Sequence, residues 1–217
     1  MHSRLQGLAV ALTAMTTTAA APTAAAQDTI VKLGVSRYTT HSQTDGGVTG
    51  IGVPPGADAE SGDATTLLLT YERLITPQIG IELVLGIPPK IKARATGTVA
   101  FLGDDVLSAQ NVSPTVFAVY HFGESGSMWR PYLGAGINFT RFVSIKSKLA
   151  PSVTMSDSIG WAVEAGVDYA LSSQWGLFGS VAALQVKSKI VASGVTVLQT
   201  TIDFRPIVYS VGVAYRF

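Results

Sequence analysis

The chain contains no cysteine and little charge, because only 13% of its 217 residues are Asp, Glu, Lys or Arg. The absence of cysteine excludes a disulfide scaffold, a thiol nucleophile and any thiolate-ligated metal. Soluble globular domains usually have about 25% charged residues, so this chain carries about half the expected charge. Its formal net charge of +1 gives no basic surface for nucleic acid, and no nucleic-acid partner is expected.

Long apolar runs are also missing. Beyond residue 27, no uncharged apolar run reaches the roughly 20 residues that a transmembrane helix requires. Hydrophobic residues nevertheless make up 47% of the chain, and the mean hydropathy is +0.35. A hydrophobic chain without spanning helices can satisfy its backbone in lipid only as a closed barrel. The composition therefore favours an outer-membrane type of β-barrel.

Residues 1–26 have the pattern of a secretory signal peptide. Arg4 precedes the short apolar stretch Gly7–Met15, and Ala24–Ala26 supplies small residues for a signal peptidase. Cleavage is expected before Gln27, which leaves residues 27–217 as one exported barrel domain. The alternative is an N-terminal membrane anchor, but the apolar stretch is short for that role.

Apolar residues alternate with small or polar residues throughout residues 27–217, and the C-terminal segment is the clearest case. One face of that segment carries Ile207, Tyr209, Val211, Val213, Tyr215 and Phe217, and the other carries Val208, Ser210, Gly212, Ala214 and Arg216. This period of two is typical of strands with one face toward lipid. Eight such strands are expected.

The connections between these strands alternate in length. Four long connections (38–64, 88–112, 144–157 and 188–200) alternate with three short ones (76–78, 123–130 and 172–174). Short periplasmic turns and long extracellular loops are typical of outer-membrane barrels. The predicted fold class is therefore an all-β, eight-stranded antiparallel transmembrane β-barrel in the cell outer membrane. A soluble eight-stranded barrel is the alternative, which the export signal and the aromatic strand ends disfavour.

Aromatic residues gather at one depth of the predicted barrel. They lie at the periplasmic strand ends: Tyr71, Tyr120, Phe122, Tyr169, Trp175, Tyr215 and Phe217. A shared depth of this kind indicates an aromatic girdle at a lipid–water interface.

The inward-facing residues of the predicted barrel divide by depth into two sets. A charged floor is expected near the periplasm, formed by Lys32, Glu72, Glu82, His121, Asp168 and Arg216, with Glu164 one layer higher. An apolar upper lumen is expected from Leu68, Val84, Phe117, Ala162, Leu184 and Val208. Charges away from bulk water must pair, so the floor predicts a salt-bridged plug. Eight strands leave room only for side chains or one small ligand, so the upper set is either packing or a path for small hydrophobic solutes.

Catalysis finds little support in the sequence. Beyond the signal peptide there are two histidines, His41 in the first long connection and His121 in the floor, and neither has the spacing of a catalytic triad. The acidic residues Asp58, Glu60 and Asp63 fit no known calcium loop. The chain is expected to be no enzyme, and no cofactor or metal is expected.

Several segments of the chain resemble one known family. They are QIGIEL (78–83), KIKARATG (90–97), PTVFAVYHF (114–122), RPYLGAGINF (130–139), GVDY (166–169) and the ending VGVAYRF (211–217). RPYLGAGINF is the most specific, and together these segments resemble the outer membrane protein W (OmpW) family of Gram-negative bacteria.

This resemblance implies an eight-stranded barrel with a narrow hydrophobic lumen that is proposed to pass small apolar compounds. It also implies that Tyr215 and the terminal Phe217 are read by the barrel-assembly machinery. The family tends to carry bulky aromatic residues around the upper lumen. The corresponding residues here are Val84 and Ile159, and Ile159 falls on the lipid-facing parity, which argues against a gate at these positions.

Three functions remain open from the sequence: a narrow channel or carrier for small hydrophobic molecules, a structural or receptor barrel acting through its extracellular loops, and a lipid-modifying barrel enzyme. The channel is favoured, with outer-membrane lipid, small hydrophobic solutes and the assembly machinery as expected partners.

Overall fold

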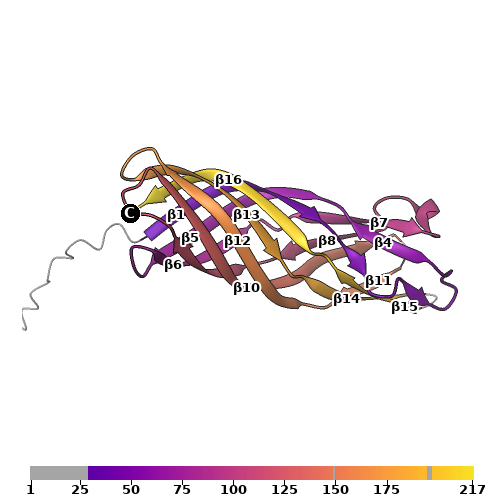
Figure 1. The fold of residues 1–217 in the computed structure, drawn as a ribbon. Coiled ribbons are helices and arrows are strands. Elements are labelled where there is room, and N and C mark those ends of the chain that lie inside the picture. Colours follow the sequence, from indigo (N-terminus) through magenta and orange to yellow (C-terminus); the bar gives the residue numbers. More distant parts are fainter. Residues whose placement is uncertain (1–28, 149, 195–196) are drawn as a thin grey trace, which may run out of the picture.

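Eight strands close into an antiparallel barrel in the computed structural model, which describes residues 29–148, 150–194 and 197–217 (Figure 1). The strands are β1 (Thr29–Thr40), β5 (Ala64–Leu74), β6 (Ile79–Gly86), β9 (Thr115–His121), β10 (Trp129–Ser147), β12 (Ser158–Ala170), β13 (Trp175–Leu184) and β16 (Pro206–Arg216). The barrel closes because β1 pairs with β16 and β10 pairs with β12. The predicted eight-stranded fold is confirmed, whereas the signal peptide and its cleavage site lie outside the described residues.

The outer wall of the barrel is apolar because side chains alternate along each strand. In β16, Tyr209, Val211 and Val213 are exposed, whereas Val208 and Ser210 face the lumen and are buried. Every barrel strand likewise carries exposed large hydrophobic side chains at alternate positions. Among the described residues, none belongs to a helix of the length and apolarity needed to cross a membrane. The strands therefore present the apolar band that lipid requires.

The long connections differ from the expected loops, because much of their length forms further strands. These are β2 (Gln43–Thr44), β3 (Thr49–Gly50), β4 (Ala57–Ser61), β7 (Lys90–Gly97), β8 (Leu107–Val112), β11 (Ser152–Met155), β14 (Lys187–Ser193) and β15 (Val197–Asp203), with a 3₁₀ turn at Ala100–Leu102. β8, β7 and β4 continue the sheet from β10, while β11, β14, β15, β2 and β3 form a second sheet. Figure 1 shows that these strands lengthen the barrel at its extracellular end.

Ion pairs join the strands of this extracellular extension. Arg94 of β7 lies 2.6 Å from Glu60 of β4, and the Lys92 ammonium lies 2.7 Å from the Asp105 carboxylate. The hydrogen bond from Lys92 lowers the pKa of the Asp105 carboxyl below its usual value. Glu60 therefore joins β4 to β7, and Asp105 joins the segment before β8 to β7, which composition alone could not show.

The aromatic residues of the predicted girdle lie at the end of the barrel with short turns. Edge-to-face ring pairs join Trp175 to Tyr215 and Tyr215 to Phe217, with centroids 4.9 and 4.7 Å apart. Trp129, which the sequence analysis did not single out, packs against Tyr169 at 4.6 Å. Amphipathic rings at one depth stabilise the barrel at the interface between lipid and water.

Candidate functional site

A buried cluster of charges crosses the lumen near its periplasmic end. Lys32 is at its centre, and its ammonium lies 3.2 Å from Glu82, 3.4 Å from Asp168 and 3.5 Å from Glu72. The same ammonium lies 4.3 Å from the centroid of the Tyr132 ring, which adds a cation–π contact. Lys32 is only 1% exposed, so these partners replace the water that the ammonium lost on burial.

His121 completes this layer from the other side of the lumen. Its Nε2 lies 2.5 Å from Glu72 Oε1, its Nδ1 lies 3.8 Å from Asp168, and neither His121 nor Glu72 is exposed. The five residues Lys32, Glu72, Glu82, His121 and Asp168 come from five different strands: β1, β5, β6, β9 and β12. We call these five residues the charged floor. Because every participating strand contributes one charge at the same depth, the floor seals the lumen and ties the barrel wall together.

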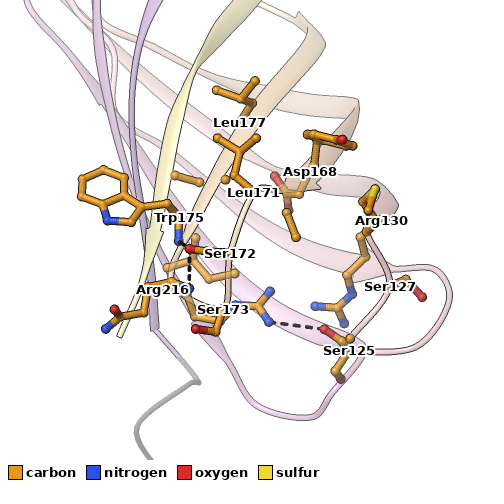
Figure 2. Close-up of a pocket in the computed structure, with 18 residues that line it drawn as sticks. Ser125, Ser127, Arg130, Asp168, Leu171, Ser172, Ser173, Trp175, Leu177 and Arg216 are labelled. Carbon is orange, nitrogen blue, oxygen red and sulfur yellow. Dashed lines mark hydrogen bonds between the residues drawn. The ribbon is translucent and has the colours of Figure 1, made fainter.

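The structure places Glu164 at the upper edge of this layer, next to Glu82, and Arg216 apart from it. Glu164 is buried and lies against Gly134, where the absence of a side chain leaves room for the carboxylate. Arg216 lies below the floor at the periplasmic mouth, where its Nη1 donates to the Ser125 carbonyl at 3.4 Å (Figure 2). Arg216 therefore belongs to the mouth, because β16 ends there and turns its last lumen-facing side chain toward the periplasm.

Above the floor, the predicted apolar residues do face the lumen. Phe117, Ala162, Leu184 and Val208 form one buried cluster with Val84 packed against it, and Leu68 is also buried. The cluster continues into the extracellular extension, where the rings of Phe142 and Phe204 lie 5.5 Å apart. We call this apolar interior the upper lumen.

Open space in the upper lumen is small. One cavity of about 40 Å³ lies above the floor, and a second of about 20 Å³ lies toward the extracellular extension. Both are lined by Tyr38, Ser113 and Leu184, so these three side chains separate them. Such volumes hold only a few water molecules. The upper lumen is therefore not an open path in this structure, because side chains of facing strands meet across so narrow a barrel.

The lining of the lower cavity is more polar than the sequence analysis suggested. The hydroxyls of Ser36 and Ser210 lie 2.8 Å apart on neighbouring strands. On the opposite side, the Asn138 side chain donates to the Thr115 hydroxyl at 2.8 Å and accepts from Thr140 at 2.7 Å. These groups satisfy one another on the side walls, whereas the charged residues Lys32, Glu82 and Glu164 form the lower end of the cavity.

The barrel wall is interrupted beside this cavity. The β6–β9 ladder ends at Val84–Thr115, and pairing resumes only where Lys90 of β7 meets Gln110 of β8. Between these points, residues 85–89 face residues 111–114 without ladder pairing. Three prolines (Pro88, Pro89 and Pro114) lie in these stretches and have no N–H to donate. We call these two stretches the wall gap.

The sealed floor, the apolar upper lumen and the interrupted wall can be compared with known proteins. The family model for the OmpW family matches residues 25–217. The chain belongs to the OmpW family. As a member of this family with a barrel fold, it is an outer-membrane protein.

Three comparisons describe the OmpW relatives. Outer membrane protein W of Escherichia coli (strain K12) is 36% identical over 119 residues, which cover 51% of this chain and 53% of that protein. The match thus spans about half the length of this relative. The crystal structure of the outer membrane protein OprG from Pseudomonas aeruginosa has a TM-score of 0.81 and 25% identity, covering 88% of this chain and 96% of that one. The dibenzothiophene metabolism operon protein PahQ of P. aeruginosa is 28% identical over 141 residues, covering 64% of each chain.

Sequence reasoning missed two floor neighbours of this OmpW-family barrel, Arg130 and Tyr132. Arg130 is 2% exposed and its Nη2 donates to the Pro77 carbonyl, which ties β10 to the β5–β6 turn. Tyr132 lies above Lys32 and is also 2% exposed. Strand alternation predicts that both side chains point inward, because Pro131, which lies between them, and Leu133, which follows Tyr132, face outward. This alternation was the signal in the sequence that could have identified Arg130 and Tyr132 as lumen residues.

The two positions considered for an aromatic gate do not face each other. Ile159 is 76% exposed on the lipid side, as its parity predicted, whereas Val84 is packed on the lumen cluster. His41 lies at the outer rim in a surface pocket that Asp203 and Arg205 also line. Within the described ranges, no hydrogen bond connects His41 to a serine or a carboxylate. These positions thus provide neither a gate nor a catalytic arrangement.

Proposed function

We propose that this barrel passes small hydrophobic molecules across the outer membrane, and that they leave sideways into lipid. The observation that carries the proposal is the combination of an apolar upper lumen with a charged floor that closes the way straight down. The five charged side chains of the floor already satisfy one another. An apolar solute that crossed the floor would have to separate buried ion pairs, which costs free energy, and it could not replace the lost contacts. A solute that enters the upper lumen therefore needs an exit through the wall.

The wall gap supplies that exit. The lower cavity reaches the gap, since Val84, Gly86 and Ser113 line both. Separating two strands costs least where no ladder hydrogen bonds have to break. An apolar solute passing through the gap enters the hydrocarbon of the membrane without crossing bulk water.

Passage also requires the upper lumen to widen. Its cavities of about 40 and 20 Å³ are smaller than any aromatic hydrocarbon, so Tyr38 and Leu184 must change rotamer as the solute passes. The barrel is therefore a carrier-like route that opens around its solute, rather than a permanently open pore. Steady ion conductance is expected to be low.

The name of one relative suggests a probe for this route. PahQ is named for a dibenzothiophene metabolism operon, and dibenzothiophene is a flat, uncharged, apolar molecule. Uptake of dibenzothiophene by cells that produce the barrel would be compared with uptake by cells without it, and with uptake of a sugar of similar size. Faster entry of dibenzothiophene alone supports the proposal, and equal entry in both strains contradicts it.

A structural or receptor barrel that acts through its extracellular strands is the second candidate. The nearly filled lumen and the ion-paired extension favour it. It predicts that uptake of apolar solutes is unchanged by the barrel, so the same experiment separates the two functions. Within residues 29–148, 150–194 and 197–217 we find no catalytic arrangement of side chains, and the absence of enzyme activity stays an expectation. Membrane lipid and the barrel-assembly machinery remain the proposed partners of either function.

A further inference from the structure

A pocket of about 440 Å³ lies at the periplasmic mouth of the barrel, below the charged floor (Figure 2). The turn at 125–128 and the turn at 170–175 form its rim, and Arg130 and Arg216 project into it. The floor separates this pocket from the upper lumen, so it is not part of the proposed solute path.

Two guanidinium groups meet in this pocket without acidic partners. Arg130 has two donors, Nε and Nη1, that are buried and have no hydrogen-bond partner. Arg216 donates only to a backbone carbonyl, that of Ser125. Neither arginine forms an ion pair within the described parts of the chain, whereas Lys32 has three carboxylates around it. Figure 2 shows the two guanidiniums reaching toward each other from opposite sides of the pocket.

The acidic residue nearest to these arginines is already engaged. Asp168 stands directly opposite Arg130 in the β10–β12 register, but its carboxylate lies 3.4 Å from Lys32 and 3.8 Å from His121. Asp168, which lines the pocket, and Glu72 both attract Arg130, but these two carboxylates are shared with Lys32 and His121. Arg216 and Arg130 repel each other across the pocket. Buried donors without acceptors are rare in folded proteins, so the two free donors of Arg130 suit an anionic ligand.

The geometry points to the periplasmic mouth as a binding site for a phosphate group, held between Arg130 and Arg216. Guanidiniums bind phosphate oxygens through paired, charge-assisted hydrogen bonds. The Ser172 hydroxyl accepts the Trp175 amide at 3.0 Å, so its own proton stays available to donate into the pocket. Two guanidiniums and one hydroxyl thus line the same pocket, a set of donors that suits the several oxygens of a phosphate group.

Two sources can supply this chemistry: free phosphate in the periplasm, or the phosphodiester headgroup of a phospholipid in the inner leaflet. The pocket lies at the depth of the aromatic girdle, beside Trp175, where headgroups of that leaflet are found. Both sources use the same two arginines. They differ only in whether an attached acyl chain strengthens binding.

The test is calorimetric titration of the refolded barrel in uncharged detergent, with inorganic phosphate and with short-chain phosphatidylglycerol as separate probes. We expect millimolar or tighter binding that weakens with salt. Arg216→Gln should weaken it about tenfold or more through loss of a charge-assisted pair. The matched control is Arg73→Gln, since Arg73 is a cation at the same end of the barrel but outside the pocket; it should leave binding unchanged.

Each outcome is informative. Binding of phosphatidylglycerol but not of inorganic phosphate assigns the site to a lipid headgroup, and binding of both assigns it to the phosphate group itself. If neither probe binds, or if Arg216→Gln binds as tightly as the unmodified chain, the proposal is wrong. Arg130→Lys provides a second variant. It keeps the positive charge but loses the planar guanidinium, so it should weaken binding without changing the net charge of the mouth.

Discussion

The Lys32 ammonium lies 3.2 Å from the Glu82 carboxylate, and the barrel encloses both groups almost completely. The two residues are on β1 and β6, which β5 separates, so the ion pair reaches across part of the lumen rather than along one hairpin. Such a pair stabilises the closed barrel only while both partners are present. It also makes the periplasmic half of the lumen an obstacle to any apolar solute.

Removing the ammonium should therefore destabilise the barrel more than removing a surface charge does. Lys32→Met leaves three carboxylates without their shared partner, and we expect a loss of about 3–5 kcal/mol in the free energy of unfolding. Urea titration of refolded barrels, followed by heat-modifiable migration, measures it. Arg37→Met is the control, because Arg37 pairs with Asp63 at the surface and should contribute less than about 1 kcal/mol.

A double variant distinguishes ion pairing from packing in this effect. Lys32→Met with Glu82→Gln removes both charges, so part of the lost stability should return. If the double variant is as unstable as the sum of the two single variants, the Lys32–Glu82 pair does not explain the stability of the floor.

Most of the barrel could be predicted from strand alternation. Because lipid accepts only apolar side chains, parity alone placed Ile159 outside and Phe117 inside, and the structure confirms both. The charged floor was predicted for the same reason, since six inward residues were placed at one depth, with Glu164 one layer higher. Arg216 was placed in the floor although it lies in the mouth, because depth counted along a strand does not show which way a terminal side chain turns.

The remaining features depend on packing and pairing across strands. Alternation says which residues face the lumen, but the size of a cavity depends on how facing side chains such as Tyr38 and Leu184 interlock. The strands of the extracellular extension were missed because their residues are polar on the outer face, so they lack the apolar alternation of a lipid-facing strand. The wall gap needed the register of β6 and β9, which one sequence does not contain.

The terminal aromatic residue should act in assembly rather than in the stability of the folded barrel. Phe217 is 55% exposed and its ring contacts Tyr215, so Phe217→Ala removes little buried surface. We expect less folded barrel in the outer membrane of cells, together with unchanged refolding of the purified chain in detergent. Cell fractionation and refolding yield measure the two effects. Equal loss in both experiments would indicate a structural role instead.

A larger side chain between the two cavities of the upper lumen should slow solute uptake. Leu184→Trp fills the upper lumen where the cavities meet, and we expect dibenzothiophene uptake to fall about tenfold, an added barrier of about 1.4 kcal/mol. Val181→Trp is the matched control, since Val181 lies on the same strand and faces lipid. If both variants take up dibenzothiophene at the unmodified rate, the solute does not pass through the upper lumen.

Filling the wall gap tests the sideways exit separately from entry. Gly86 borders the gap and lines the lower cavity, and a side chain added there would meet its nearest atom, the Leu67 carbonyl oxygen, at 3.4 Å, an ordinary contact. Gly86→Phe should place an aromatic ring beside the gap and lower dibenzothiophene uptake about tenfold, and heat-modifiable migration checks that the variant folds.

The control for this variant is Ile87→Phe, whose ring points into lipid because Ile87 is 59% exposed. Because Gly86 lines the lower cavity, solute binding is measured separately, as protection of the barrel against thermal unfolding; we expect Gly86→Phe to retain this protection. Binding without uptake in Gly86→Phe, with normal uptake in Ile87→Phe, would identify the gap as the exit. Normal uptake in both would exclude the gap as the exit.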